Sequence, residues 1–404
     1  MHKCLVCNNK IFNQILNLKK QPLANSLRIK KSDKQKKYPL NLVHCKKCST
    51  VQLDYVVNPK KLFENYVWKT NSSKFVKIYA KEFFNKFNKK LNKNSKILEI
   101  ASNDGTFLRD FKKKNHFVIG VDPAKNIAQI ANNANIKTIP KFFNLKTSKN
   151  IKKNYGKFDF VFARNVIPHV KEINSIIKGV NNIMNDKGIC AIEFHYSGKI
   201  LDELHYDSIY HEHLHYFTIK TISKIFGKFN LFPFDVFKSP ISGGSLVISF
   251  SKKRIKKSTN LNKLIKKENL KKYNSYKTWK NFGTKSQIHK EILVKIIEKF
   301  KNKKYQIIGY GASARSSTVI NYADINEKSV EYIIDNNPLK KNKFSPGTNI
   351  KIISFSEIKK SFKKLCIIIF AWNFKDEIIN SLKKFRIKAK LIIPFPNKVI
   401  VYEI

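Results

Sequence analysis

Four cysteines near the start of the chain occur as two pairs with the same spacing. Cys4 and Cys7 form one Cys-x-x-Cys pair, and Cys45 and Cys48 form the second. Two such pairs supply four thiolates, the tetrahedral set that Zn²⁺ prefers in structural sites. Disulfides and a redox Cys-x-x-Cys motif are the alternatives. Because four thiolates leave no coordination position for a substrate, we expect the metal to stabilise the fold without taking part in chemistry.

A second group of reactive side chains lies in the run from Tyr210 to Phe217, with the sequence YHEHLHYF. Four of the ten histidines fall between His205 and His215. A histidine can act as a base near neutral pH, and a neighbouring carboxylate such as Glu212 can orient it. Alternate histidines of an extended segment share a face, so a metal site is a second interpretation. A polar surface loop is the third.

A turn that could hold a nucleotide follows the apolar segment that begins at Ile97, in ILEIASNDG. Backbone amides of a tight turn at the start of a helix can bind a polar or anionic ligand. The next predicted strand ends at Asp122, whose carboxylate could accept both ribose hydroxyl protons. Gly105 is the only glycine in this turn, so the dinucleotide fingerprint is absent, which favours S-adenosylmethionine (SAM). An ordinary turn with a buried aspartate is the structural alternative.

A similar pattern occurs again in the C-terminal third, where IGYGASAR ends at Arg315 and the next strand is followed by Asp335. Arg315, near the expected start of a helix, could contact a phosphate. A Rossmann-like unit that binds nothing explains the pattern equally well.

Alternating strands and helices must position these groups. In the middle of the chain the predicted strands are 96–100, 117–121, 158–163 and 188–194, and helical patterns cover Pro123–Asn133 and Lys171–Met184. Such alternation predicts an α/β fold with a parallel sheet between two layers of helices. Strands around 234–237 and 245–250 should form an antiparallel hairpin at its edge.

Three domains are predicted from these patterns: a zinc-binding domain over residues 1–68, an α/β domain with the candidate SAM turn over 69–252 and a second, smaller Rossmann-like domain over 253–404. The last should open with one long amphipathic helix, about Leu261–Phe300. No internal repeat is present.

The net charge of +52 raises the question of nucleic-acid binding. Lysines supply most of this charge and are spread along the whole chain, as biased codon usage would produce, so a nucleic-acid partner is not expected. The charge should still attract anionic ligands such as nucleoside diphosphates. No run of about 18 apolar residues predicts a membrane span. The N-terminus lacks a signal-peptide pattern, so we expect a cytoplasmic protein.

These motifs, in this order, resemble the SAM-dependent sugar C-methyltransferases of deoxysugar pathways. The resemblance covers essentially the whole chain, and its most specific segments are SNDGTFL (102–108), YHEHLHYF (210–217), GYGASARSSTVINY (309–322) and IDNNPLKKNKFSPGTNI (334–350). It implies a zinc domain, a class I SAM-binding domain and a C-terminal Rossmann-like domain. It also implies a nucleoside-diphosphate 4-keto-6-deoxysugar as the substrate.

The resemblance assigns catalytic roles to the histidine run. His213 would remove a proton from the carbon beside the ketone, and the resulting enolate would take the methyl group of SAM. Tyr210 and His169 would donate hydrogen bonds to the enolate oxygen, where such donors contribute most to rate. Glu212 would bind a polar substituent of the sugar, and Tyr66 would do likewise.

The same resemblance implies the contacts to SAM. Asn103 and Gly105 would line the turn, with Glu99 and Asp122 as its acidic partners. Asn165 would lie where the methyl donor meets the substrate.

Three positions depart from the family pattern. Ala101 replaces a glycine of the SAM turn, which leaves its backbone less room, and Lys141 replaces an acidic residue that contacts adenosine. His215 replaces a small residue and should alter substrate preference.

Two other functions fit parts of the sequence. An RNA methyltransferase would share the SAM fold, but it would give His213 no obvious task. A non-catalytic sugar-nucleotide binding protein would bind SAM poorly. The sequence leaves the choice between a monomer and a homodimer open.

Overall fold

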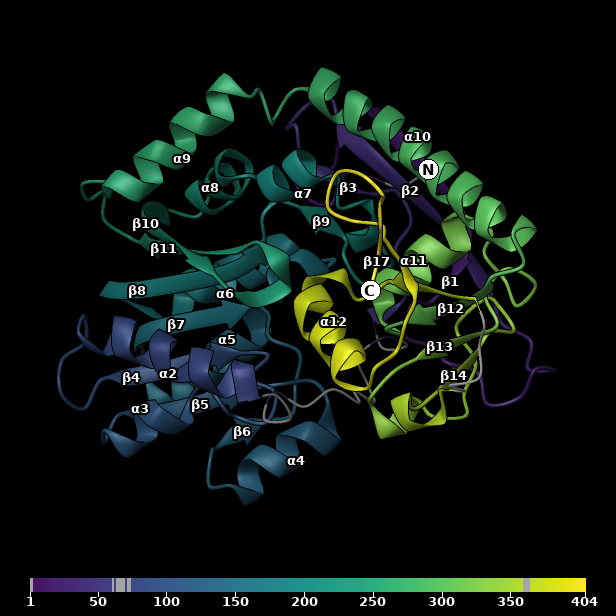
Figure 1. The fold of residues 1–404 in the computed structure, drawn as a ribbon. Helices are drawn as coiled ribbons and strands as arrows, with labels where there is room; N and C mark the ends of the chain where they lie inside the picture. Colours follow the sequence, from purple (N-terminus) through teal and green to yellow (C-terminus); the bar gives the residue numbers. More distant parts are fainter. Residues whose placement is uncertain (1–2, 60–61, 63–69, 71–73, 359–363) are drawn as a thin grey trace.

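Three β-sheets organise the chain in this computed structural model, which describes residues 3–59, 62, 70, 74–358 and 364–404 (Figure 1). The N-terminal sheet is antiparallel, with the order β1-β2-β3-β9. Its strands are β1 (Phe12–Pro22), β2 (Lys37–Cys45), β3 (Val51–Leu53) and β9 (His215–Tyr216). Strand β9 comes from the histidine run, so a segment from the middle of the chain completes the N-terminal sheet.

The central sheet has seven strands in the order β10-β11-β8-β7-β4-β5-β6. Neighbouring strands are parallel except where β11 runs antiparallel to both β8 and β10. The strands are β4 (Lys96–Ile100), β5 (Phe117–Val121), β6 (Thr138–Ile139), β7 (Phe158–Arg164), β8 (Met184–His195), β10 (Phe232–Ser239) and β11 (Ser245–Ser251). The four predicted strands and the predicted hairpin are therefore confirmed.

Helices cover both faces of this sheet because its strands bury side chains alternately on either side. On β4, Ile97 packs into one core, whereas Leu98 and Ile100 pack into the other. The helices around the sheet are α2 (Lys74–Asn88), α3 (Arg109–Lys113), α4 (Lys125–Asn133), α5 (Leu145–Tyr155), α6 (Ile173–Ile183) and α8 (Ile219–Gly227). Helix α7 (Ser197–Glu203) follows β8 and buries Ile200 in the core of the other two sheets. The carboxyl ends of the parallel strands thus form one edge, where ligands bind in such sheets.

The C-terminal sheet has six strands in the order β14-β13-β12-β15-β16-β17, parallel except for β17. Its strands are β12 (Gln306–Tyr310), β13 (Tyr332–Ile334), β14 (Lys351–Ile353), β15 (Leu365–Ile369), β16 (Lys390–Ile393) and β17 (Ile400–Glu403). Helices α11 (Ala314–Tyr322) and α12 (Lys375–Lys384) belong to this second Rossmann-like unit. The expected α/β architecture is confirmed.

The single helix predicted over Leu261–Phe300 is wrong. The structure has α9 (Thr259–Leu270), which packs near β10, and α10 (Tyr276–Asn302), which packs along β1 (Figure 1). Lys272 in the break has a φ of 51°, and Ser275 caps α10 by accepting a hydrogen bond from the backbone N–H of Thr278. The apolar periodicity resumes in α10, so the sequence pattern conceals the break.

Close contact between α10 and β1 requires a glycine. A Cβ atom at Gly283 would lie 2.1 Å from the carbonyl oxygen of Ile15. The N-terminal and C-terminal sheets also share one apolar core with residues 200–216. The domain boundaries at 68/69 and 252/253 stay predictions. Among the described residues, no helix has the length and apolar character needed to cross a membrane.

Candidate active site

The four cysteines converge on one point. The Sγ atoms of Cys4 and Cys48 lie 3.6 Å apart, as do those of Cys7 and Cys45, and all four Sγ atoms lie within 4.8 Å of one another. A tetrahedron of sulfurs about 2.3 Å from zinc has edges of about 3.8 Å, so the cluster fits Zn²⁺. The disulfide alternative does not fit, because bonded sulfurs lie about 2 Å apart.

The turn after β4 has an unusual backbone. Ala101, Asn103 and Gly105 have φ values of 53°, 49° and 74°. A Cβ atom at Gly105 would approach Cγ2 of Ile136 to 2.8 Å, so this position requires glycine for space as well as for conformation. Ala101 adopts a left-handed conformation that its Cβ disfavours, and such strain is typical of ligand-binding turns.

Asp122, directly after β5, holds this turn in place. One carboxylate oxygen accepts the backbone N–H of Asn103 at 2.8 Å, and the other accepts the N–H of Ala124 at 2.9 Å. Burial raises the pKa of Asp122, whereas these two hydrogen bonds lower it. Each oxygen keeps a further lone pair, which can accept a ribose hydroxyl as predicted.

Two buried carboxylates beside the turn share one guanidinium group. Arg164 Nε lies 3.3 Å from Glu99, and its Nη1 lies 4.0 Å from Glu193. Burial raises the pKa of Glu99 to about 8, although Arg164 opposes that change. Oε2 of Glu99 has no hydrogen-bond partner in the described part of the chain. A cationic ligand that donates a hydrogen bond would satisfy this site, and the ammonium group of SAM is such a ligand.

Asn165 links the SAM side of the site to the histidine run. This residue follows β7 with a φ of 50°, and its backbone N–H donates to the carbonyl of Glu193 at 2.9 Å. Backbone groups of Glu212 and Asn165 both interact with the ring of His169. Burial lowers the pKa of His169 to about 4, so the ring is neutral at pH 7.

The hydrogen bonds of His213 define which ring nitrogen carries the proton. Nδ1 lies 2.8 Å from the carbonyl oxygen of Ser208, and Nε2 lies 2.8 Å from the hydroxyl of Tyr210. A carbonyl can only accept, so Nδ1 carries the hydrogen of the neutral ring and Nε2 accepts from Tyr210. Burial keeps the pKa of His213 well below its ordinary value. The rings of His169 and His213 meet edge to face, with centroids 4.8 Å apart.

Glu212 points toward the N-terminal sheet. The side-chain amide of Asn25, in the loop between β1 and β2, donates to Oε1 of Glu212 at 2.6 Å. Burial raises the pKa of Glu212 to about 6, and the Asn25 hydrogen bond opposes this rise. Sequence reasoning missed Asn25, because nothing in its local sequence marks a contact across 187 positions. Tyr66 lies outside the described residues.

The other two histidines of the run, His211 and His215, contact backbone carbonyls, and the predicted effect of His215 on substrate preference stays a prediction. His211 is buried and lies 3.3 Å from the carbonyl oxygens of Tyr38 and Pro39, and His215 is buried and bonds to the carbonyl of Val170 at 3.0 Å. The surface-loop interpretation is therefore wrong. The metal interpretation gains no support, since in the described ranges the four cysteines form the only candidate metal cluster.

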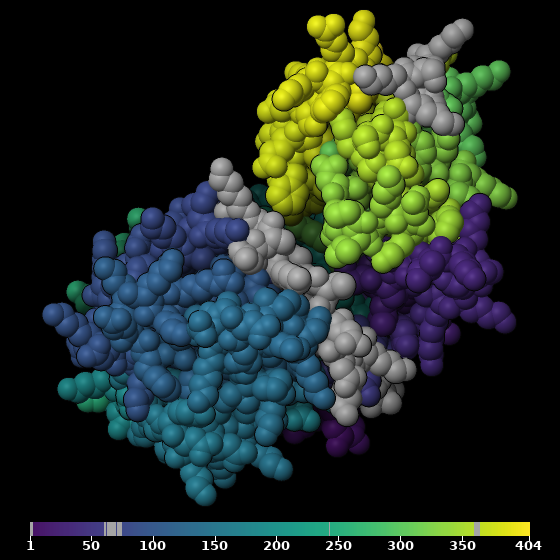
Figure 2. Space-filling view, turned by 90° about the horizontal axis from the view of Figure 1, so that it is seen from below, coloured from purple at the N-terminus to yellow at the C-terminus, as the bar shows by residue number. Residues whose placement is uncertain are grey.

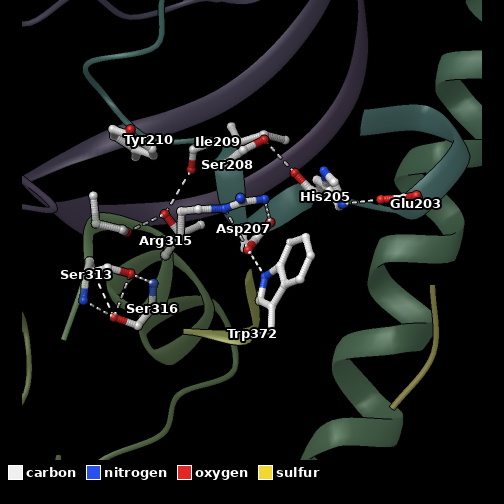
Figure 3. Close-up of polar contacts among 12 residues, drawn as sticks. Glu203, His205, Asp207, Ser208, Ile209, Tyr210, Ser313, Arg315, Ser316 and Trp372 are labelled. Atoms are coloured by element: carbon white, nitrogen blue, oxygen red, sulfur yellow. Dashed lines mark hydrogen bonds and ion pairs between the residues drawn. The ribbon is translucent and has the colours of Figure 1, made fainter. Parts of the chain in front are cut away.

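Arg315 contacts the segment just before the histidine run. Its Nη2 donates to Oδ1 of Asp207 at 2.9 Å, and Nε lies 2.9 Å from Oδ2 (Figure 3). Its predicted phosphate contact stays a prediction.

A space-filling view shows a hollow between the lobe that carries the central sheet and the lobe that carries the C-terminal sheet (Figure 2).

Comparisons with known proteins identify the kinds of domain that this chain resembles. Three family descriptions match in order: a zinc binding domain over residues 4–63, a methyltransferase domain over 73–232 and a C-methyltransferase C-terminal domain over 240–396. The C-methyltransferase NovU of Streptomyces niveus is 23% identical over 402 residues, which is 98% of this chain and 96% of the relative.

Two solved structures are each similar to just under half of the chain. The PH0226 protein of Pyrococcus horikoshii is 16% identical, with a TM-score of 0.37, over 49% of this chain and 100% of its own. Magnesium protoporphyrin IX methyltransferase ChlM of Synechocystis, solved with bound SAM, is 11% identical, with a TM-score of 0.34, over 43% of this chain and 78% of its own.

The fold, the turn after β4 and the cysteine cluster define a class I SAM-dependent methyltransferase with a zinc-binding domain. The three matches together span most of the chain, and with the near-full-length similarity to NovU they bear out the C-methyltransferase family predicted from the sequence. SAM is its methyl donor, and zinc is its structural metal.

Proposed function

We propose that this enzyme methylates a carbon beside the ketone of a nucleoside-diphosphate 4-keto-6-deoxysugar, with His213 as the base. The single observation that carries the proposal is the tautomer of His213. Its Nδ1–H is held by the carbonyl of Ser208, so the lone pair of Nε2 faces the position of the Tyr210 hydroxyl. A neutral ring with a fixed acceptor nitrogen is what proton abstraction requires.

The proposed reaction begins with proton transfer from the carbon beside the ketone. As the C–H bond breaks, Nε2 of His213 takes the proton, and the bonding electrons move to the ketone oxygen as an enolate. The hydroxyl of Tyr210 now donates to Nε2, and it can donate instead to an enolate oxygen that enters beside it. When bound, SAM would supply the electrophilic methyl group: a C–C bond would form at the enolate carbon as the S–CH3 bond breaks, and S-adenosylhomocysteine would leave with those electrons. His213 then releases its proton to solvent.

Two further residues serve the substrate in this proposal. The neutral ring of His169 meets His213 edge to face and can donate to the same oxygen. Glu212, oriented by Asn25, binds a hydroxyl or amino substituent of the sugar. The positive charge of the chain favours the approach of an anionic nucleoside diphosphate.

Deuterium exchange tests the base without methyl transfer. The enzyme is incubated in D₂O with TDP- or GDP-linked 4-keto-6-deoxyhexoses and no SAM, and NMR follows the hydrogens beside the ketone. We expect exchange with the unmodified enzyme and with His116→Gln, whose histidine bonds to Asn88 away from this site. His213→Gln should abolish exchange while retaining SAM binding by calorimetry. Exchange that persists in His213→Gln would refute the assigned base.

A further inference from the structure

A short segment that precedes the histidine run is held by the C-terminal part of the chain. This segment comprises the 3₁₀ helix η3 (Tyr206–Ser208) and Ile209. The hydroxyl of Tyr206 lies 3.0 Å from Nδ1 of His289 on α10, and the hydroxyl of Thr318 on α11 donates to the carbonyl of Ile209 at 3.1 Å. Both ends of the segment are therefore tied to residues beyond 275.

Asp207 makes charged and hydrogen-bonded contacts with the same part of the chain. Its side chain is 1% exposed. Besides the paired contacts from Arg315, its Oδ2 accepts the indole N–H of Trp372 at 2.8 Å (Figure 3). The guanidinium of Arg315 also lies 4.8 Å from the Trp372 ring. Arg315 thus contacts both oxygens of Asp207, one by the hydrogen bond from Nη2 and the other by the charge contact of Nε, and this two-pronged contact restricts the position of the carboxylate.

The next residue in the chain connects Asp207 to the catalytic base. The carbonyl oxygen of Ser208 accepts the Nδ1–H of His213 and so defines its tautomer. Ser208 is itself fixed, because its hydroxyl donates to the carbonyl of His205 at 2.6 Å. A shift of Asp207 would move the Ser208 carbonyl and, with it, the ring of His213.

The edge of the C-terminal sheet that binds Asp207 is the edge at which Rossmann-like units bind ligands. Here the protein chain packs closely on itself. A Cβ atom at Gly311 would lie 2.4 Å from Cβ of Ala371, so this glycine allows close packing of the chain. Asp335 accepts the backbone N–H of Ala312 at 2.9 Å and pairs with Lys340 at 3.0 Å. The side chains of this edge therefore bind an internal carboxylate.

We propose that Arg315 and Trp372 are positioning residues, which hold Asp207 so that the Ser208 carbonyl orients His213 for proton abstraction. The C-terminal Rossmann-like unit then holds the segment that orients His213. The anionic group that this unit binds is an internal one, the carboxylate of Asp207. This inference rests on the proposed role of His213.

Two variants test it by the same exchange reaction in D₂O. Arg315→Lys keeps a positive charge but loses the two-pronged contact, and Trp372→Phe keeps an aromatic ring but loses the N–H donor. The matched control is Lys340→Gln, which breaks an ion pair in the same unit without touching η3. SAM binding and thermal unfolding are measured for each protein.

We expect the exchange rate to fall by roughly 10- to 100-fold in Arg315→Lys and roughly tenfold in Trp372→Phe, since small displacements of catalytic groups have effects of this size. The KM for the sugar nucleotide and the affinity for SAM should not change, and Lys340→Gln should match the unmodified enzyme. Should Arg315→Lys fail to fold, Trp372→Phe alone decides.

Two results would overturn the inference. A raised KM with an unchanged exchange rate would make Arg315 a phosphate ligand. Unchanged exchange in both variants would mean that η3 keeps its position without them. Neither result affects the assignment of His213, which its own glutamine variant tests separately.

Discussion

Glu212 should destabilise the folded protein above pH 6, and replacing it with glutamine should relieve that effect. Its side chain is buried, and burial raises its pKa from 4.5 to about 6. The folded state therefore holds this proton more tightly than the unfolded state does. The resulting stabilisation is complete below pH 4.5 and is lost as the pH rises through 6. The pKa difference corresponds to about 2 kcal/mol.

Glu212→Gln removes the charge and keeps the shape, and its amide oxygen can still accept from Asn25. We therefore expect the variant to be more stable than the unmodified protein by about 2 kcal/mol at pH 8 and equally stable at pH 4.5. Urea denaturation followed by fluorescence at the two pH values measures the difference. Glu331→Gln, at an exposed position, is the control and should show no difference at either pH.

The same urea midpoint for Glu212→Gln and the unmodified protein at both pH values would contradict a destabilising charge at this position. A gain in stability that is independent of pH would contradict it as well, because the effect would then come from packing and not from charge. A functional carboxylate commonly reduces stability in this way, so the same variant should bind the sugar nucleotide more weakly.

Two further perturbations probe the metal and the SAM turn. Cys45→Ser should release the zinc and unfold the N-terminal sheet. Sugar-nucleotide binding should then weaken, because Asn25 and the strand that pairs with β9 belong to that region. Metal analysis, circular dichroism and calorimetry measure these three effects, and an unchanged sugar-nucleotide affinity after zinc loss would show that the sheet does not support the sugar pocket. Gly105→Ala should weaken SAM binding and lower the free energy of unfolding by at least about 1 kcal/mol, because the new Cβ would meet Ile136 at a position whose φ is 74°. Calorimetry and thermal unfolding measure the two effects. The control is Gly227→Ala, because a Cβ at that position meets nothing within 4 Å.

The strands and the metal cluster could be predicted because their signals are local. Apolar runs bounded by polar residues mark β4, β5 and β7, and two Cys-x-x-Cys pairs need no knowledge of the fold. The contact between Arg315 and Asp207 spans 108 positions, and no sequence spacing encodes it. Arg164 is an intermediate case, because a charged residue at the end of a buried strand is a detectable sign of a site.

Two other features were hidden for different physical reasons. The break between α9 and α10 depends on tertiary contacts of Tyr273, whose hydroxyl donates to Asp202 at 2.6 Å, whereas the helical periodicity on either side is nearly continuous. Strand β9 has only two residues, too few for an alternating pattern to appear. Its partner strand, β3, could not be identified from His215 and Tyr216 alone.

The short strand β9 has a consequence for how the protein is made. Among the strands of the N-terminal segment β3 is the outermost on its side of the sheet. The backbone groups of Val51 and Gln52 pair with residues 215–216, which leave the ribosome more than 150 residues later. Until then β3 is an open edge, to which other strands can add. The N-terminal sheet is therefore complete only after the histidine run has been synthesised and has paired with β3. A fragment ending at residue 59 would expose this edge permanently and would tend to aggregate.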